Sequence, residues 1–129
     1  MRNQENRLLT SELLEELASY PLYSQEHKKV CDLFAVALLH IGSIRWYILE
    51  GNAEGDCFTF FTLVCGMGHE SELGYADAGE LAGIAVDASR YGMPGITLKV
   101  ERAEDFKPCR LADIDDEDVQ NYVARFAEE

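Results

Sequence analysis

The sequence predicts an α+β fold in which an antiparallel β meander of four to five strands is accompanied by an N-terminal helix, a short middle helix and a C-terminal helix. Three observations predict this class. The chain has 129 residues, 47% of them hydrophobic, so residues 1–129 have the size of a single domain. Amphipathic helical patterns lie near the two ends of the chain. The apolar runs between them are joined by connections that are short enough for antiparallel pairing.

The helices are predicted from capping residues and from apolar spacing. Thr10 can cap an N-terminal helix whose apolar residues are Leu13, Leu14 and Leu17. Asp77 and Glu80 have the spacing of a capping box and predict the short middle helix. The C-terminal helix is expected from about Asp115, because four apolar residues follow at positions i, i+3, i+4 and i+7: Val119, Tyr122, Val123 and Phe126.

Strand-like runs occupy the middle of the chain. They cover residues 30–41, 44–50, 57–65, about 73–76 and 96–100. The first two runs are separated by Gly42-Ser43, which fits a two-residue hairpin turn. Residues 51–56 are expected to form a turn-rich loop. The run 57–65 is apolar on both of its faces, which indicates a central strand covered on both sides.

Acidic residues dominate the charge, with 24 Asp and Glu against 11 Lys and Arg and a net charge of −13. Residues 50–87 contain no Lys or Arg, and residues 113–118 are a nearly continuous acidic run. Such a surface repels nucleic acid phosphates and anionic membranes, so direct binding to either is not expected. Thirteen charges equal those on roughly 22 Å of duplex DNA, so the charge is sufficient for DNA mimicry.

The sequence therefore favours a non-enzymatic acidic protein, without a cofactor, that binds the basic surface of another protein. One form of this hypothesis is an inhibitor of a nucleic-acid-binding protein of host defence, whose phosphate sites the carboxylates would occupy. The four cysteines form no CxxC pair and no export signal opens the chain, so a cytoplasmic location is expected. Eight residues are expected to bind the partner: Glu54, Asp56, Glu70, Glu72, Asp115, Asp116, Glu117 and Asp118.

Two other function classes remain open from the sequence. A small metal-binding or hydrolytic enzyme would be centred on Cys65 and His69, with a thiol next to an imidazole base or with His69, Glu70 and Glu72 as metal ligands. An assembly module would expose its apolar strands to a second copy of the chain. The acidic run fails as a calcium-binding EF-hand loop, because Asp118 and Ala124 stand where that loop needs Gly and Glu.

Several short motifs occur together in a specific order. They lie at residues 21–26 (PLYSQE), 46–47 (WY), 50–51 (EG), 61–66 (FTLVCG), 69–75 (HESELGY), 80–81 (EL), 92–94 (GMP) and 100–102 (VER). In this combination the chain resembles domain-of-unknown-function family 2958, small bacterial proteins often carried on plasmids, phages and other mobile elements. The resemblance covers residues 8–111 and implies a mobile-element setting. Because that family has no established activity, the resemblance implies no catalytic residue.

Overall fold

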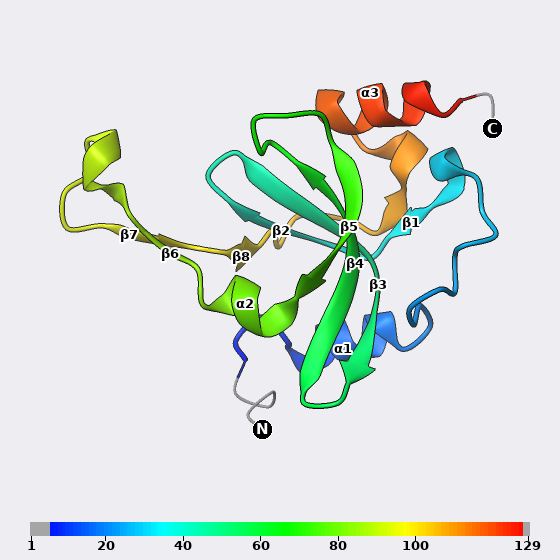
Figure 1. Ribbon diagram of the computed structural model, residues 1–129, viewed down its shortest axis with the longest axis horizontal. Helices are drawn as coiled ribbons and strands as arrows, with labels where there is room; N and C mark the ends of the chain where they lie inside the picture. Colours follow the sequence, from blue (N-terminus) through cyan, green and yellow to red (C-terminus); the bar gives the residue numbers. More distant parts are fainter. Residues whose placement is uncertain (1–5, 128–129) are drawn as a thin grey trace.

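The computed structural model describes residues 6–127 and has the α+β architecture that the sequence predicts. Its main sheet has five antiparallel strands in the order β5-β4-β3-β2-β8. Their bounds are Ala37–Ile41 for β2, Ile44–Glu54 for β3, Cys57–Cys65 for β4, Glu72–Asp77 for β5 and Glu101–Arg102 for β8. Strands β2 to β5 follow one another as a meander, and β8 returns to the other edge of β2 (Figure 1).

The first two hairpins of the meander have tight turns. Strands β2 and β3 are joined through residues 42–43, as predicted. The loop expected over residues 51–56 is wrong, because β3 continues through Glu54 and pairs with β4 up to a two-residue turn. Gly55 in that turn has a φ of +64°, a conformation that glycine adopts without strain.

The first apolar run, residues 30–41, is not a single strand. A short 3₁₀ helix covers Val30–Asp32, and β1 (Phe34–Ala35) pairs with a strand from near the C-terminus before β2 begins. The Gln25 side chain accounts for the interruption, since its amide accepts from the N–H of Phe34 and donates to the carbonyl of Phe34. With both backbone groups of Phe34 satisfied by this side chain, the main sheet begins only after it.

Each α-helix begins after a residue whose side chain caps it. The bounds are Ser11–Leu17 for α1, Ala78–Ala82 for α2 and Glu117–Arg125 for α3. The capping residues are Thr10, Asp77 and Asp116, and the sequence predicts the first two. Helix α3 begins two residues later than the expected Asp115, because Asp116 is the cap itself.

Apolar clusters cover both faces of the main sheet. Helices α1 and α2 pack on one face, in a cluster that includes Leu13, Leu17, Leu39, Ile48, Phe60 and Leu81. Helix α3 and the segment before it pack on the other face, in a cluster that includes Leu49, Leu63, Leu111, Val119 and Tyr122. Strand β4 contributes Phe60 to the first cluster and Leu63 to the second, which confirms the prediction of a strand covered on both sides. Figure 1 shows α1 and α3 at opposite ends of the layered strands.

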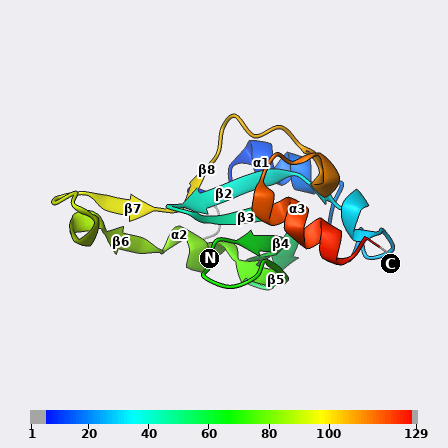
Figure 2. The ribbon, with the colours of Figure 1, turned by 90° about the horizontal axis from the view of Figure 1, so that it is seen from above.

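A two-stranded arm projects from the body of the molecule, as Figure 1 and Figure 2 both show. It consists of β6 (Ala85–Asp87) and β7 (Thr97–Lys99), with a 3₁₀ helix over Ala88–Tyr91 between them. The sequence predicts the second strand of the arm but not its partner. After β8, the chain passes through β9 (Cys109–Arg110) and a 3₁₀ helix over Leu111–Asp113 into α3.

Candidate functional site

The eight acidic residues expected to bind a partner are divided between two ends of the main sheet. Glu54 is opposite Cys57 at the β3–β4 turn, whereas Arg45 is opposite Cys65 at the other end of the same strand pair. The nine residues of β4 span about 26 Å. Glu54 and Asp56 therefore lie apart from the other six residues. These six are named here the α3 cluster: Glu70, Glu72, Asp115, Asp116, Glu117 and Asp118.

Arg45 binds two carboxylates of the α3 cluster. Its Nε and Nη2 donate to the two oxygens of Asp116 at 3.0 and 2.9 Å, and Nη2 also donates to Asp118 at 2.7 Å. The hydroxyl of Tyr47, two residues along β3, donates to Asp116 as well. Strand β3 thereby fixes the position of the first turn of α3.

The surroundings of Asp116 favour its ionised form. Only 14% of this side chain is exposed, and burial alone opposes ionisation. The hydrogen bond from Tyr47 and the charge of Arg45 outweigh the burial and hold the pKa of Asp116 below its ordinary value. Burial, followed by the bond to Asp116, raises the pKa of Tyr47, so the phenol remains a donor. The charge of Asp116 is thus already engaged inside the molecule.

A second arginine joins α3 to the β4–β5 loop. The Nη1 of Arg125 lies 3.2 Å from Oε1 of Glu70 and donates to the carbonyl of Ser71 at 3.4 Å. Its guanidinium lies 5.2 Å from the ring centroid of Tyr122. A small hollow of about 160 Å³ is lined by Glu70 from the loop and by Asp118 from α3. The two sequence segments of the α3 cluster therefore meet at this hollow.

Three members of the α3 cluster keep free charges. Glu72, Asp115 and Glu117 are exposed, and no described residue forms an ion pair with them. The six carboxylates of the cluster exceed the two arginines that bind it by four negative charges. This end of the sheet therefore presents unneutralised acids next to acids that arginines hold in place.

The thiol and the imidazole of the alternative enzyme hypothesis lie in contrasting environments. Cys65 is fully buried, and burial raises the pKa of its thiol. His69 is exposed, with Nδ1 2.8 Å from the carbonyl oxygen of Glu70. A buried thiol with a raised pKa is a poor nucleophile, because the thiolate is the reactive form. Within residues 6–127, no three His, Cys, Asp or Glu side chains are grouped as metal ligands.

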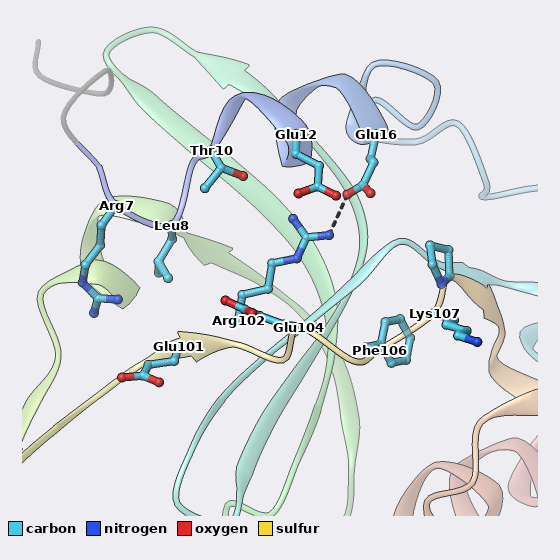
Figure 3. A pocket seen from close by; sticks show the side chains of 11 residues that line it. Arg7, Leu8, Thr10, Glu12, Glu16, Glu101, Arg102, Glu104, Phe106 and Lys107 are labelled. Carbon is cyan, nitrogen blue, oxygen red and sulfur yellow. Dashed lines mark hydrogen bonds and ion pairs between the residues drawn. The ribbon is translucent and has the colours of Figure 1, made fainter.

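A polar groove of about 720 Å³ lies between α1 and β8 (Figure 3). Arg102 extends across it towards α1 and donates from Nη2 to Glu16 at 2.8 Å. Its Nη1 is buried and has no hydrogen-bond partner among the described residues. The charged side chains that line the groove nearly balance: Glu12, Glu16, Glu101 and Glu104 against Arg7, Arg102 and Lys107. The ion pair between Arg102 and Glu16 connects β8 to α1. The lining of the groove has little excess charge with which to select a ligand.

A buried carboxylate that the sequence does not single out organises the loop after α1. Glu50 is 3% exposed, and its oxygens accept from the N–H groups of Tyr23 and Gln25 at 2.7 and 2.8 Å. Tyr23 has a φ of +74°, the one positive φ outside glycine among the described residues. This conformation costs free energy for a residue with a side chain, so the contact with Glu50 holds a strained loop.

Sequence reasoning overlooks Arg45 and Glu50 for the same reason. Both belong to the apolar run 44–50, which is assigned to a strand without regard to its charges. A charged side chain in a largely buried strand needs a partner, because an unpaired buried charge is costly. The signal is therefore the charge itself, which predicts an internal partner from elsewhere in the chain.

Comparisons with known proteins find no match for this chain among family models, curated proteins or solved structures. The resemblance of its motifs to family 2958 stays a prediction. No helix in the described part of the chain is long and apolar enough to cross a membrane. Functional assignment therefore depends on the geometry and charge of the chain itself.

Proposed function

We propose that this protein is an acidic binding domain whose α3 cluster docks on the basic surface of a protein partner. One observation carries this proposal: six acidic residues from two separate segments share one end of the sheet, with an excess of four negative charges. Arg45 and Arg125 fix the backbone that presents the free carboxylates, which limits the entropy lost on binding. Association with a basic surface is then fast and weakens with added salt.

A nucleic-acid-binding protein is the partner class that this charge favours. Such proteins hold phosphates with clustered Lys and Arg side chains, and the same clusters attract carboxylates. The α3 cluster would occupy these phosphate sites and inhibit nucleic acid binding. The hydrolytic alternative has less support, because the thiol on which it depends is buried with a raised pKa.

The experiment compares two triple variants with the same change in net charge. The first, Glu72→Gln/Asp115→Asn/Glu117→Gln, removes the free charges of the α3 cluster. The second, Glu15→Gln/Glu80→Gln/Asp105→Asn, removes three exposed charges elsewhere. Tagged wild type captures partners from a bacterial lysate over a salt series, and the retained basic protein is identified by mass spectrometry.

The wild type is expected to retain a basic protein that salt elutes and that added DNA duplex displaces. The first triple variant should weaken this binding by about tenfold or more, since charge complementarity controls association, and the second by less than about threefold. Equal losses in both variants would show that only net charge matters and would remove the α3 cluster from the assignment. Retention that neither salt nor duplex disturbs would contradict an electrostatic partner.

A further inference from the structure

A third pocket, of about 320 Å³, lies beside β3, β4 and β5, which are adjacent in the sheet (Figure 1). Its apolar lining residues are Val30, Leu33, Phe61 and Leu73. Two exposed tyrosines, Tyr23 and Tyr75, also line it, together with Glu50. This volume suits a small ligand or one long side chain.

The sheet register assembles the pocket from three strands. Glu50 on β3 is opposite Phe61 on β4, and Phe61 is opposite Tyr75 on β5. Opposite residues of neighbouring antiparallel strands point to the same face of a sheet, so the three form a row. A β-bulge between Ile48 and Glu50 places Glu50 in this row. Without the extra residue, Glu50 would share the opposite face with Ile48.

Tyr23, one of the two exposed tyrosines, has a backbone conformation that the packing of its side chain does not explain. The side chains of Tyr23 and Tyr75 are 58% and 57% exposed. The Tyr75 ring centroid lies 5.0 Å from that of Phe61. Tyr23 has the strained φ described above, yet its side chain gains little from burial. Strain of this kind persists only where surrounding contacts hold it, as Glu50 does here, and it is concentrated at functional sites.

The charge that faces the pocket is negative. Glu26 and Glu50 line it, together with Lys28. The Lys28 ammonium is engaged, because it donates to the Gln25 side chain at 3.2 Å and lies 5.8 Å from the ring centroid of Tyr20. The two carboxylates exceed the single ammonium by one negative charge, so the potential that a ligand would meet is negative.

The same potential reaches the phenol of Tyr75. The neighbouring phenol of Tyr23 is the main cause that raises the pKa of Tyr75, followed by desolvation and by the carboxylates of Glu50 and Glu54. Two separate acidic residues thus contribute to the negative potential at this phenol.

We propose that this pocket is an aromatic cage for one cationic side chain, an arginine or a lysine, of a basic protein partner. Tyr23, Phe61 and Tyr75 line the pocket, and aromatic rings attract a cation that sits over them. Glu50, in one row with Phe61 and Tyr75, adds a buried negative charge, which its hydrogen bonds to two backbone N–H groups leave ionised. A guanidinium or ammonium group is favoured over an anion by every carboxylate near the pocket. This proposal rests on the proposed function, because the cage would bind one cationic side chain of the same basic partner that the α3 cluster attracts.

The cage can be tested without a partner protein. N-acetyl-arginine amide and N-acetyl-lysine amide are titrated into ¹⁵N-labelled protein, with the citrulline and norleucine analogues as neutral controls of similar shape. Saturable amide shifts are expected around Tyr23, Glu50, Phe61 and Tyr75. The cations should bind about tenfold more tightly than their neutral analogues, because the cation–π and charge contributions are absent from the analogues.

A matched pair of tyrosine variants locates the binding. Tyr75→Leu removes a ring from the cage, and Tyr91→Leu removes a similarly exposed tyrosine from the arm. The first should weaken cation binding by about five- to tenfold and the second should leave it unchanged. Circular dichroism verifies that both variants fold.

Three results would overturn the cage: no saturation, equal binding of arginine and citrulline, or unchanged affinity in Tyr75→Leu. None of them affects capture of a salt-released partner by the α3 cluster. Conversely, loss of partner capture in the first triple variant leaves the amino-acid titration unchanged. The two proposals therefore fail separately.

Discussion

Strand β3 has a charged residue just before its buried stretch, Arg45, and another within that stretch, Glu50, and the two stabilise the fold in different ways. Arg45 binds carboxylates of α3 that remain partly accessible, with side chains that are 14% to 50% exposed. Glu50 is 3% exposed and binds backbone N–H groups of the loop after α1. Water can replace part of an accessible ion pair, whereas buried backbone donors that lose their acceptor stay unpaired. The contribution of a charge to stability therefore depends more on what it satisfies than on its sign.

The largest expected effect is at Glu50. Glu50→Ala leaves the N–H groups of Tyr23 and Gln25 without an acceptor, so unfolding in urea should show a loss of about 2–6 kcal/mol, from about 1–3 kcal/mol for each donor. Glu54→Ala, at the exposed end of the same strand, is the control and should change stability by less than about 0.5 kcal/mol. Similar losses of stability in Glu50→Ala and Glu54→Ala would show that the hydrogen bonds of Glu50 to the loop do not add to stability.

The next effect is at Asp116, within the acidic run. Asp116→Ala removes the cap of α3 and the partner of Arg45 and Tyr47, so a loss of about 2–4 kcal/mol is expected from thermal or urea unfolding. Asp115→Ala, one residue earlier and exposed, should stay within about 0.5 kcal/mol of wild type. Equal losses of stability in Asp116→Ala and Asp115→Ala would contradict the distinction between paired and free acids in the α3 cluster.

The Asp116 contribution should depend on pH. The pKa of this carboxyl is lower in the folded chain than its ordinary 3.8, so folding favours the ionised form. The resulting stabilisation is complete well above 3.8 and is lost as the pH falls through the lower folded value. The difference in free energy of unfolding between wild type and Asp116→Asn should thus be constant above about pH 5 and narrow in more acidic solution. A difference in free energy of unfolding that stays constant down to acid pH would contradict a stabilising role for the ionised Asp116.

The smallest effect concerns the strained loop that Glu50 holds. Tyr23→Asn places a residue that tolerates positive φ at this position, so stability should rise by about 0.5–1 kcal/mol. The same variant removes a ring from the cage and should weaken arginine binding in the titration described above. Opposite changes in stability and binding would show that Tyr23 is retained for function. A loss of stability would instead indicate that the tyrosine contributes packing.

Local patterns in the sequence predict much of the fold. The caps Thr10 and Asp77, the turn at residues 42–43 and the double-faced strand β4 all depend on residues close to one another in the chain. Turn geometry, capping and apolar alternation are local physical effects, so a single sequence contains them.

The features that the sequence does not predict depend on distant partners. The Gln25 side chain interrupts the apolar run 30–41 by binding the backbone of Phe34, and Arg45 reaches Asp116 across 71 positions. The acidic run itself is predicted as a set of exposed residues, but its division into paired and free charges follows from Arg45 and Arg110, which lie outside it. Sequence patterns indicate which groups need partners and leave open which partners they meet.

The strand order also has a kinetic consequence. Two-residue turns join β2 to β3 and β3 to β4, and hairpins of this kind form in roughly 1–10 μs. The segment that carries β8 and α3 must first close a long loop to reach the meander, and such closures come late in folding. The contact between Arg45 and Asp116 therefore belongs to the last stage of assembly. Weakening this contact should raise the unfolding rate while leaving the folding rate nearly unchanged. The ion pair therefore prolongs the lifetime of the native state.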